Sequence, residues 1–111
     1  MDRQIQNIMQ HFAQKMKKIF DGNLKSIIIY GSYARGDYNK QSDIDVMILV
    51  SLPDDEIRAR MNEVSDCAFD FLISYGVDIS PIVKNIEHFN YWVDNLPFYH
   101  NVMEEGVEVS V

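Results

Sequence analysis

Two aspartates stand at the start of an apolar segment that runs to Val50, and their type and spacing are suited to chemistry: Asp43 and Asp45. The segment is typical of a β-strand, in which side chains two residues apart point to the same face, with Cα atoms about 7 Å apart. Two carboxylates at this separation repel each other, and burial raises the pKa of one of them. A divalent cation removes the repulsion, and Mg²⁺ prefers one or two carboxylates together with the phosphates of a substrate.

A glycine–serine pair follows the preceding apolar segment, which includes residues 27–29 and predicts a buried strand. Gly31 allows backbone N–H groups to approach a phosphate, and the hydroxyl of Ser32 adds a further donor. We therefore expect this loop to bind a triphosphate, while the strand that begins near Asp43 binds the metal.

The spacing between this pair and the two aspartates resembles a known signature. Gly31-Ser32, the intervening residues 33–42 and Asp43-x-Asp45 match the G-S-x10-D-x-D pattern of the nucleotidyltransferases related to DNA polymerase β. The resemblance covers most of the chain, and its diagnostic part is the central third. The fuller string is similar to that of the minimal nucleotidyltransferases, the MNT domains, at four more residues: Ala34, Arg35, Gly36 and Ser42.

The resemblance implies a fold of the α/β (α+β) class, with a palm-like mixed β-sheet packed by helices and residues 1–111 in a single domain. It also implies a third metal-binding carboxylate on the strand beside the D-x-D strand, and Asp78 matches that position. From the residues alone, Asp78 could equally be a turn or capping aspartate. Arg35 has two interpretations, a salt bridge that shapes its loop or a bidentate contact with nucleotide phosphates.

The activity implied by the resemblance is Mg²⁺-dependent nucleotidyl transfer, with ATP as the expected donor of AMP. Gly31 and Ser32 would hold the β- and γ-phosphates. Asp43 and Asp45 would bind two Mg²⁺ ions, and Asp78 would complete the metal site and help to deprotonate an acceptor hydroxyl.

The acceptor is the open part of this hypothesis. Stand-alone MNT proteins resemble antitoxins that adenylylate a tyrosine of a small helical HEPN toxin, so a HEPN-like protein is the expected partner. Two alternatives stay open. One is a transferase that acts on a small hydroxyl compound, and the other is a non-catalytic module that neutralises a toxin by binding alone.

Composition limits the other classes of function. A chain of 111 residues with a single cysteine, Cys67, fits one domain with a modest core and no internal disulfide. Acidic residues outnumber basic ones 17 to 10, giving a net charge of −7, which argues against nucleic-acid binding and suits a basic protein partner. The assembly state stays open between a homodimer and a hetero-oligomer. No apolar segment is as long as a membrane span and the N-terminus does not read as a signal peptide, so a cytoplasmic location is expected.

The hydrophobic periodicity predicts the order of the elements. Pro81 places the third strand at an edge of the sheet, because proline cannot donate to a ladder. The predicted elements are a helix over 2–20 ended by a left-handed Gly22, strands over 24–30 and 42–50 separated by a loop over 33–41, a helix that starts within 51–56 and ends at Gly76, a strand over 77–83, a helix in two pieces within 85–105, and a short strand over 107–109.

Two sets of apolar residues bear on packing and partners. The long central helix is expected to bury a single stripe, and the aromatic residues near the C-terminus exceed what a small core needs, so that some of them should lie on an exposed interface. The stripe consists of Ile57, Met61, Val64, Ala68, Phe69, Leu72 and Tyr75, and the aromatic set consists of Phe89, Tyr91, Trp92, Phe98 and Tyr99.

Overall fold

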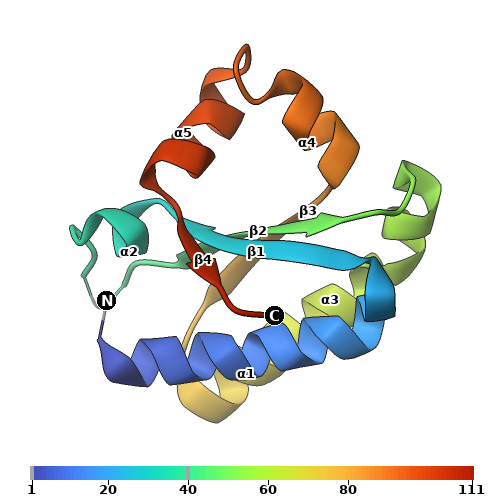
Figure 1. The fold of residues 1–111 in the computed structure, drawn as a ribbon. Helices are drawn as coiled ribbons and strands as arrows, with labels where there is room; N and C mark the ends of the chain where they lie inside the picture. The colour runs from blue at the N-terminus through green and yellow to red at the C-terminus, as the bar shows by residue number, and fades with distance from the viewer. Residues whose placement is uncertain (1, 40) are drawn as a thin grey trace.

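A four-stranded mixed sheet lies between two layers of helices in the computed structural model, which describes residues 2–39 and 41–111 (Figure 1). Helices α1 and α3 cover one face of the sheet, and α4 and α5 cover the other. The mixed sheet packed by helices is the fold class predicted from the sequence. The elements are α1 (Arg3–Phe20), η1 (Asp21–Asn23), β1 (Leu24–Tyr30), α2 (Ser32–Arg35), β2 (Ile44–Val50), α3 (Asp54–Tyr75), β3 (Ile79–Asn85), α4 (Ile86–Trp92), α5 (Pro97–Glu105) and β4 (Val107–Val109).

The strand order is β3-β2-β1-β4, with β2 parallel to β3 and β1 antiparallel to both β2 and β4. The third strand begins at Ile79, two residues later than predicted, and Pro81 lies in it at the sheet edge, as predicted. Within the described residues, no helix is long and apolar enough to cross a membrane.

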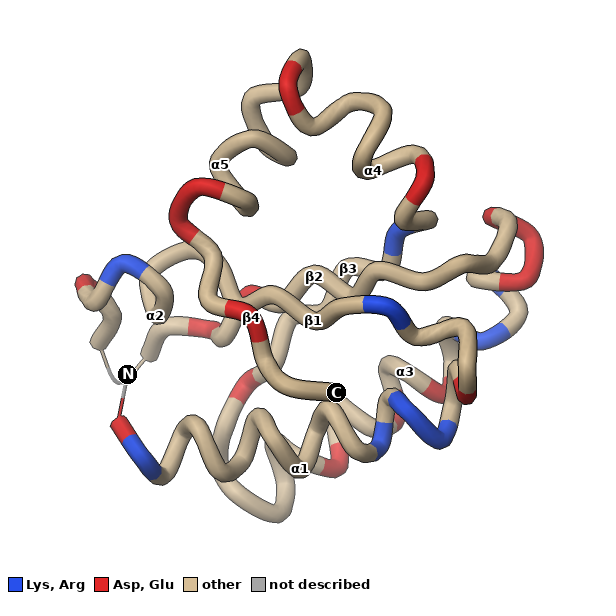
Figure 2. The backbone as a smooth tube through the Cα atoms, viewed as in Figure 1, with Lys and Arg blue, Asp and Glu red and all other residues tan. Residues whose placement is uncertain are grey.

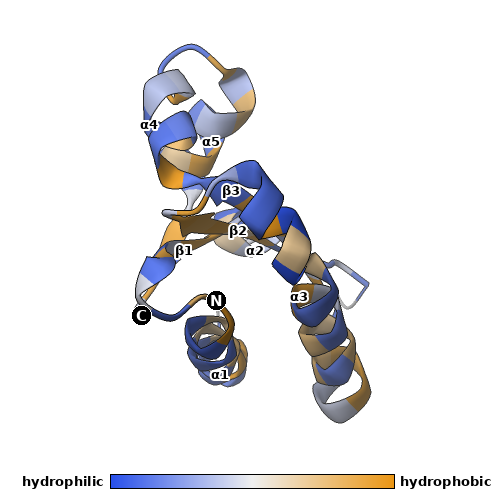
Figure 3. Ribbon diagram, turned by 90° about the vertical axis from the view of Figure 1, so that its right-hand side faces the viewer, coloured by the Kyte–Doolittle hydropathy of each residue, from blue (hydrophilic) through white to orange (hydrophobic). Residues whose placement is uncertain are grey.

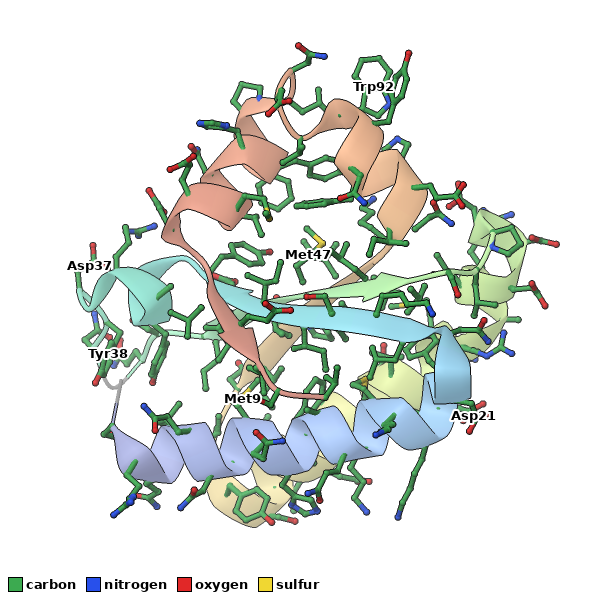
Figure 4. The ribbon with its side chains drawn as sticks, in the orientation of Figure 1. Met9, Asp21, Asp37, Tyr38, Met47 and Trp92 are labelled. Atoms are coloured by element: carbon green, nitrogen blue, oxygen red, sulfur yellow. The ribbon has the colours of Figure 1, made fainter. Side chains whose placement is uncertain are left out.

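Strand β2 is buried on both faces, which explains its nearly continuous apolar sequence. Ile44, Val46 and Ile48 belong to the core beneath α1 and α3, whereas Met47 and Leu49 belong to the core beneath α4 and α5. Figure 4 shows this division, with Met9 of α1 and Met47 of β2 on opposite sides of the sheet. Burial of each such side chain contributes about 1.5–3 kcal/mol, so the register of β2 is strongly fixed.

The first helix begins and ends with aspartates. The side chain of Asp2 accepts a hydrogen bond from the backbone N–H of Ile5 at 2.8 Å, a typical N-cap. At the other end the residue with positive φ is Asp21, with φ 52° and ψ −134°, and the prediction of a left-handed Gly22 is wrong. Asp is one of the non-glycine residue types found most often at positive φ. The left-handed cap predicted at Gly76 is confirmed, with φ 68°.

Helix α3 departs from the predicted stripe in its C-terminal half. The side chains of Phe69, Leu72 and Tyr75 were expected in the core, but they are exposed to 60%, 37% and 45%. Phe71 takes the core position instead, because the buried series continues from Ala68 by three residues, whereas position 69 lies about 100° further round the helix.

The aromatic residues near the C-terminus divide between the core and the surface. Phe89 and Tyr99 are buried and pack against each other, with ring centroids 4.9 Å apart. Tyr91, Trp92 and Phe98 are exposed, as expected for part of this set, and Trp92 points away from the body of the molecule (Figure 4).

Replacement of a buried and an exposed phenylalanine on α3 tests this assignment. Phe71→Ala should lower the free energy of unfolding by about 3–5 kcal/mol, because it leaves a cavity where the ring packs edge-on against Phe12 with centroids 5.4 Å apart. Phe69→Ala removes the same atoms from an exposed position and should change the free energy by less than about 0.5 kcal/mol. Urea unfolding measures the free energy of unfolding of both variants. Equal losses would contradict the assignment of Phe71 to the core and of Phe69 to the surface.

Candidate functional site

The parallel pairing of β2 with β3 brings Asp43 and Asp78 together. The register pairs Ile44 with Ile79, so that each aspartate is the residue immediately before a paired position. The backbone N–H of Ile44 donates to the carbonyl of Asp78 at 2.8 Å, which extends the pairing to this end of the sheet. The two side chains also share a hydrogen bond. Asp78 was named from resemblance, and the register supplies a physical reason for its position.

The three aspartates influence one another electrostatically. Partial desolvation raises the pKa of Asp45, the negative charge of Asp43 raises it further, and Arg35 opposes the shift. Desolvation also raises the pKa of Asp78, followed by the charge of Asp43 and the hydrogen bond to it. Asp43 therefore interacts with both other carboxylates, and Asp45 and Asp78 have pKa values above that of an isolated carboxyl group.

The glycine–serine pair lies directly against this group of acids. Gly31 has φ 75° and ψ −151°, and a Cβ atom placed on it would lie 2.5 Å from Oδ2 of Asp45. Only glycine combines this backbone conformation with such a close approach. Ser32 begins the short helix α2, which is the helical turn allowed for in the loop predicted over 33–41. The backbone of Gly31, which was predicted to bind phosphates, is thus adjacent to the carboxylate of Asp45, which was predicted to bind a metal ion.

Arg35 forms the salt bridges that one of its two interpretations requires. Its Nε lies 3.3 Å from Oδ2 of Asp37, and its Nη1 lies 3.4 Å from Oε2 of Glu105. Both pairs are solvent-exposed, and exposed pairs typically contribute 0–1 kcal/mol, so they would yield to a competing phosphate at small cost. Contact between Arg35 and a phosphate stays a prediction.

Two clefts open on either side of the aspartates. The first, of about 490 Å³, contains Asp45 together with the glycine–serine pair, and we call it the phosphate cleft. The second, of about 300 Å³, contains Asp43 and Asp78 together with residues of α3, and we call it the α3 cleft. The phosphate cleft is lined by Tyr30, Gly31, Ser32, Arg35, Asp45, Phe98, Asn101, Val102 and Glu105, and the α3 cleft by Asp43, Ser65, Ala68, Phe69, Leu72, Asp78, Ile79, Ser80 and Pro81.

Sequence reasoning missed the residues that α5 brings to the phosphate cleft. Asn101 and Glu105 lie there because α5 leads directly into β4, which pairs with β1. The turn between them requires Gly106, where a Cβ atom would collide with the carbonyl of Val102 and with the side chain of Ile28. A glycine at the end of a predicted helix was the available signal, but it indicates a helix end and not where the helix lies.

The acids suit Mg²⁺ by donor type, since carboxylate oxygens are its preferred protein ligands and their mutual repulsion is relieved by a cation. Their arrangement is open in the structure: in residues 2–39 and 41–111, no group of three or more His, Cys, Asp or Glu side chains is placed to hold a metal ion. Metal binding by Asp43, Asp45 and Asp78 stays a prediction.

Comparison with known sequences identifies relatives that span nearly the whole chain. A family model described as a nucleotidyltransferase domain matches residues 9–99. A protein of Methanocaldococcus jannaschii, named as a candidate protein adenylyltransferase, is 40% identical over 98 residues, which are 88% of this chain and 90% of that protein. A second protein of this organism, also named as a candidate protein adenylyltransferase, is 32% identical over 107 residues, which are 96% of this chain and 99% of that protein.

Solved structures share the fold. A candidate nucleotidyltransferase from Sulfolobus solfataricus superposes with a TM-score of 0.62 at 22% identity, over 95% of this chain and 78% of that one. A toxin–antitoxin structure with AMP-PNP contains a chain with a TM-score of 0.55 at 18% identity, over 91% and 72%. A complex of the tri-AMPylated Shewanella oneidensis HEPN toxin with MNT antitoxin contains a chain with a TM-score of 0.50 at 16% identity, over 95% of this chain and 71% of that one. The predicted nucleotidyltransferase fold is thereby confirmed.

The contact between Gly31 and Asp45 can be tested by comparing two glycines with positive φ. Gly31→Ala should lower the free energy of unfolding by about 2 kcal/mol or more, from backbone strain and from displacement of the Asp45 carboxylate. Gly36→Ala is the matched control: its φ is 84°, but a Cβ atom there meets open space, so about 1 kcal/mol of strain is expected.

Chemical denaturation of both variants, alone and combined with Asp45→Ala, measures the contact. The excess cost of Gly31→Ala over Gly36→Ala should shrink when Asp45 is truncated, and the part that remains is the greater backbone strain at Gly31, whose ψ is −151° against 8° at Gly36. An excess that is undiminished in the Asp45→Ala background would show that the close approach of the two residues has no energetic consequence.

Proposed function

The chain belongs to the nucleotidyltransferase domain family, and from that membership we propose that it transfers AMP from Mg²⁺-bound ATP to a hydroxyl group of a partner protein. One observation carries the proposal. The glycine–serine pair and three interacting aspartates meet at the same end of the sheet, with a cleft on each side of the acids.

Each residue has a chemical role in this proposal. Gly31 and Ser32 bind the β- and γ-phosphates through backbone N–H groups and a hydroxyl. Asp43 and Asp45 hold two Mg²⁺ ions, which when bound stabilise the attacking and leaving oxygens of an in-line displacement. Arg35 exchanges its surface salt bridges for a contact with the phosphates.

The proposed reaction forms one bond and breaks one. The acceptor oxygen bonds to the α-phosphorus of ATP, the bond from that phosphorus to the bridging oxygen breaks, and pyrophosphate leaves from the phosphate cleft. The proton of the acceptor hydroxyl passes to the carboxylate of Asp78, which lies beside Asp43 in the α3 cleft. The acceptor product carries AMP on oxygen.

The relatives support adenylyl transfer to a protein. The M. jannaschii proteins are named as candidate protein adenylyltransferases, and the structural neighbours include an AMP-PNP complex and an AMPylated HEPN toxin bound to an MNT antitoxin. We therefore propose a HEPN-like partner, with this chain as the antitoxin. The net charge of −7 suits a basic protein and disfavours a nucleic acid as the partner.

Transfer of label from α-³²P-ATP tests the proposal. With Mg²⁺ and a HEPN protein encoded in the same genome, label should appear on the HEPN protein. Asp43→Ala should reduce the rate by about 100-fold or more, because it removes a metal ligand. Ser32→Ala should reduce it by about tenfold or less, because one neutral hydroxyl contributes about 0.5–1.5 kcal/mol.

Asp94→Asn is the control variant, since it removes an acidic residue from the turn between α4 and α5, outside both clefts, and should transfer label at the wild-type rate. Tight binding of the HEPN protein and of ATP without transfer of label would favour a binding module that neutralises its target by occlusion. Label on a small hydroxyl compound alone would favour the small-molecule transferase.

A further inference from the structure

Helix α3 presents a second apolar stripe that the core does not use. Phe69, Leu72 and Ile73 follow the i, i+3, i+4 spacing of a single helix face, and Phe69 and Ile73 are exposed to 60% and 70%. We call these three residues the α3 patch. Figure 3 shows that α3 lies on the opposite side of the sheet from α4 and α5, which therefore do not cover it. Three large apolar side chains on one exposed helix face are typical of an interaction surface.

The α3 patch is continuous with the candidate site. Phe69 and Leu72 line the α3 cleft together with Asp43 and Asp78, whereas neither residue lines the phosphate cleft. An in-line displacement places the attacking and leaving oxygens on opposite sides of the phosphorus. Since the leaving pyrophosphate is assigned to the phosphate cleft, the acceptor has to approach from the α3 cleft.

The charges around the α3 patch are predominantly negative. Two hollows border the α3 patch: the α3 cleft and a hollow of about 800 Å³ lined by residues of α1 and α3. Carboxylates line both hollows, and the basic residues among the lining are two lysines of α1. In Figure 2 the lysines of α1 lie toward the C-terminal end of that helix, which is the end away from α2. The acidic residues are Asp43, Glu63, Asp66, Asp70 and Asp78, and the lysines are Lys15 and Lys18.

This balance of charge decides between two kinds of occupant. A second copy of the chain would bring the same excess of carboxylates to the contact and would be repelled. A partner with an apolar segment flanked by Lys or Arg would be attracted, and its apolar side chains would cover the exposed rings and methyl groups.

We propose that the α3 patch is the docking surface for the acceptor protein, which covers it with an apolar segment flanked by basic residues and so directs its hydroxyl group to Asp43 and Asp78. The proposal rests on the proposed function, since it assigns the surface that receives the acceptor of that reaction. It places the acceptor on the side of the sheet that carries α1 and α3, and not on the exposed aromatic residues of α4.

Calorimetric titration of a HEPN protein of the same genome into the full-length chain without ATP measures docking alone. Phe69→Ser and Ile73→Ser should each weaken binding by about tenfold or more, as expected for apolar residues at the centre of an interface. Tyr91→Ser is the matched control, because Tyr91 is a 73% exposed aromatic on α4 and should leave the affinity unchanged. ATP affinity and the free energy of unfolding are measured for Ile73→Ser, and both should match wild type.

The same variants are then assayed for label transfer, so that failure of docking and failure of chemistry are distinguished. Binding that depends on the α3 patch without any transfer of label would support docking and contradict the proposed function. Binding and labelling that are unchanged in Phe69→Ser and Ile73→Ser would overturn the docking proposal and leave the proposed function intact. Self-association through the α3 patch, or the absence of any complex with wild type, would also overturn it.

Discussion

Mutual repulsion among Asp43, Asp45 and Asp78 is the constraint around which this structure is organised. The positions of Asp43 and Asp78 are fixed by the parallel register of β2 and β3, because β2 is almost wholly buried and β3 buries Ile79 and Val83. A shift of one residue in β2 would exchange the side chains that its two faces present to the two cores and would carry Asp45 to the opposite face of the sheet. The hydrophobic cores therefore hold the carboxylates close together at the end of the sheet, where partial desolvation, followed by the charge of Asp43, raises the pKa values of Asp45 and Asp78.

The close approach of Gly31 to Asp45 couples this group to the predicted phosphate-binding loop. A cation bound by the acids would offset the charge of phosphates bound by the loop, because the backbone of Gly31 comes so close to Asp45 that a Cβ atom added to Gly31 would lie 2.5 Å from the Oδ2 of that aspartate. In the proposed reaction the nucleotide would bind in the cleft on the side of α5 and the acceptor would approach through the cleft on the side of α3. The exposed apolar stripe of α3 beside the acids offers a surface for the proposed acceptor protein.

Local pattern predicted the parts of the fold that burial determines. The doubly buried strand β2, the amphipathic α1 and the edge position of Pro81 followed from hydrophobic period and from the chemistry of proline. The pattern failed on α3, because its last turns are apolar on two faces and periodicity does not tell which face meets the core. The pattern also failed at the end of α1, where Gly22 was predicted to have a positive φ because glycine adopts it most readily, but Asp21 has it instead.

Asp43, Asp45 and the glycine–serine pair were found from their spacing and Asp78 from the family resemblance, and the structure brings them to the same end of the sheet. The contribution of α5 to the phosphate cleft could not be predicted, since it depends on the long-range pairing of β4 with β1 and on the space that Gly106 leaves for it. Contacts between segments far apart in the sequence leave no local signal of this kind.

The most direct test of this account is the free energy of unfolding of wild type and Asp43→Asn, with and without Mg²⁺ and ATP. Because Asp45 and Asp78 have raised pKa values in the folded state, their contribution favours folding at acid pH and is lost as the pH rises through those values. In EDTA near neutral pH, Asp43→Asn should therefore be more stable than wild type, and the difference should shrink towards about pH 4.

Addition of Mg²⁺ and ATP should reverse the order, because wild type gains binding energy that the variant lacks. An Asp43→Asn variant that is less stable than wild type in EDTA, or that is stabilised equally by Mg²⁺ and ATP, would contradict the account.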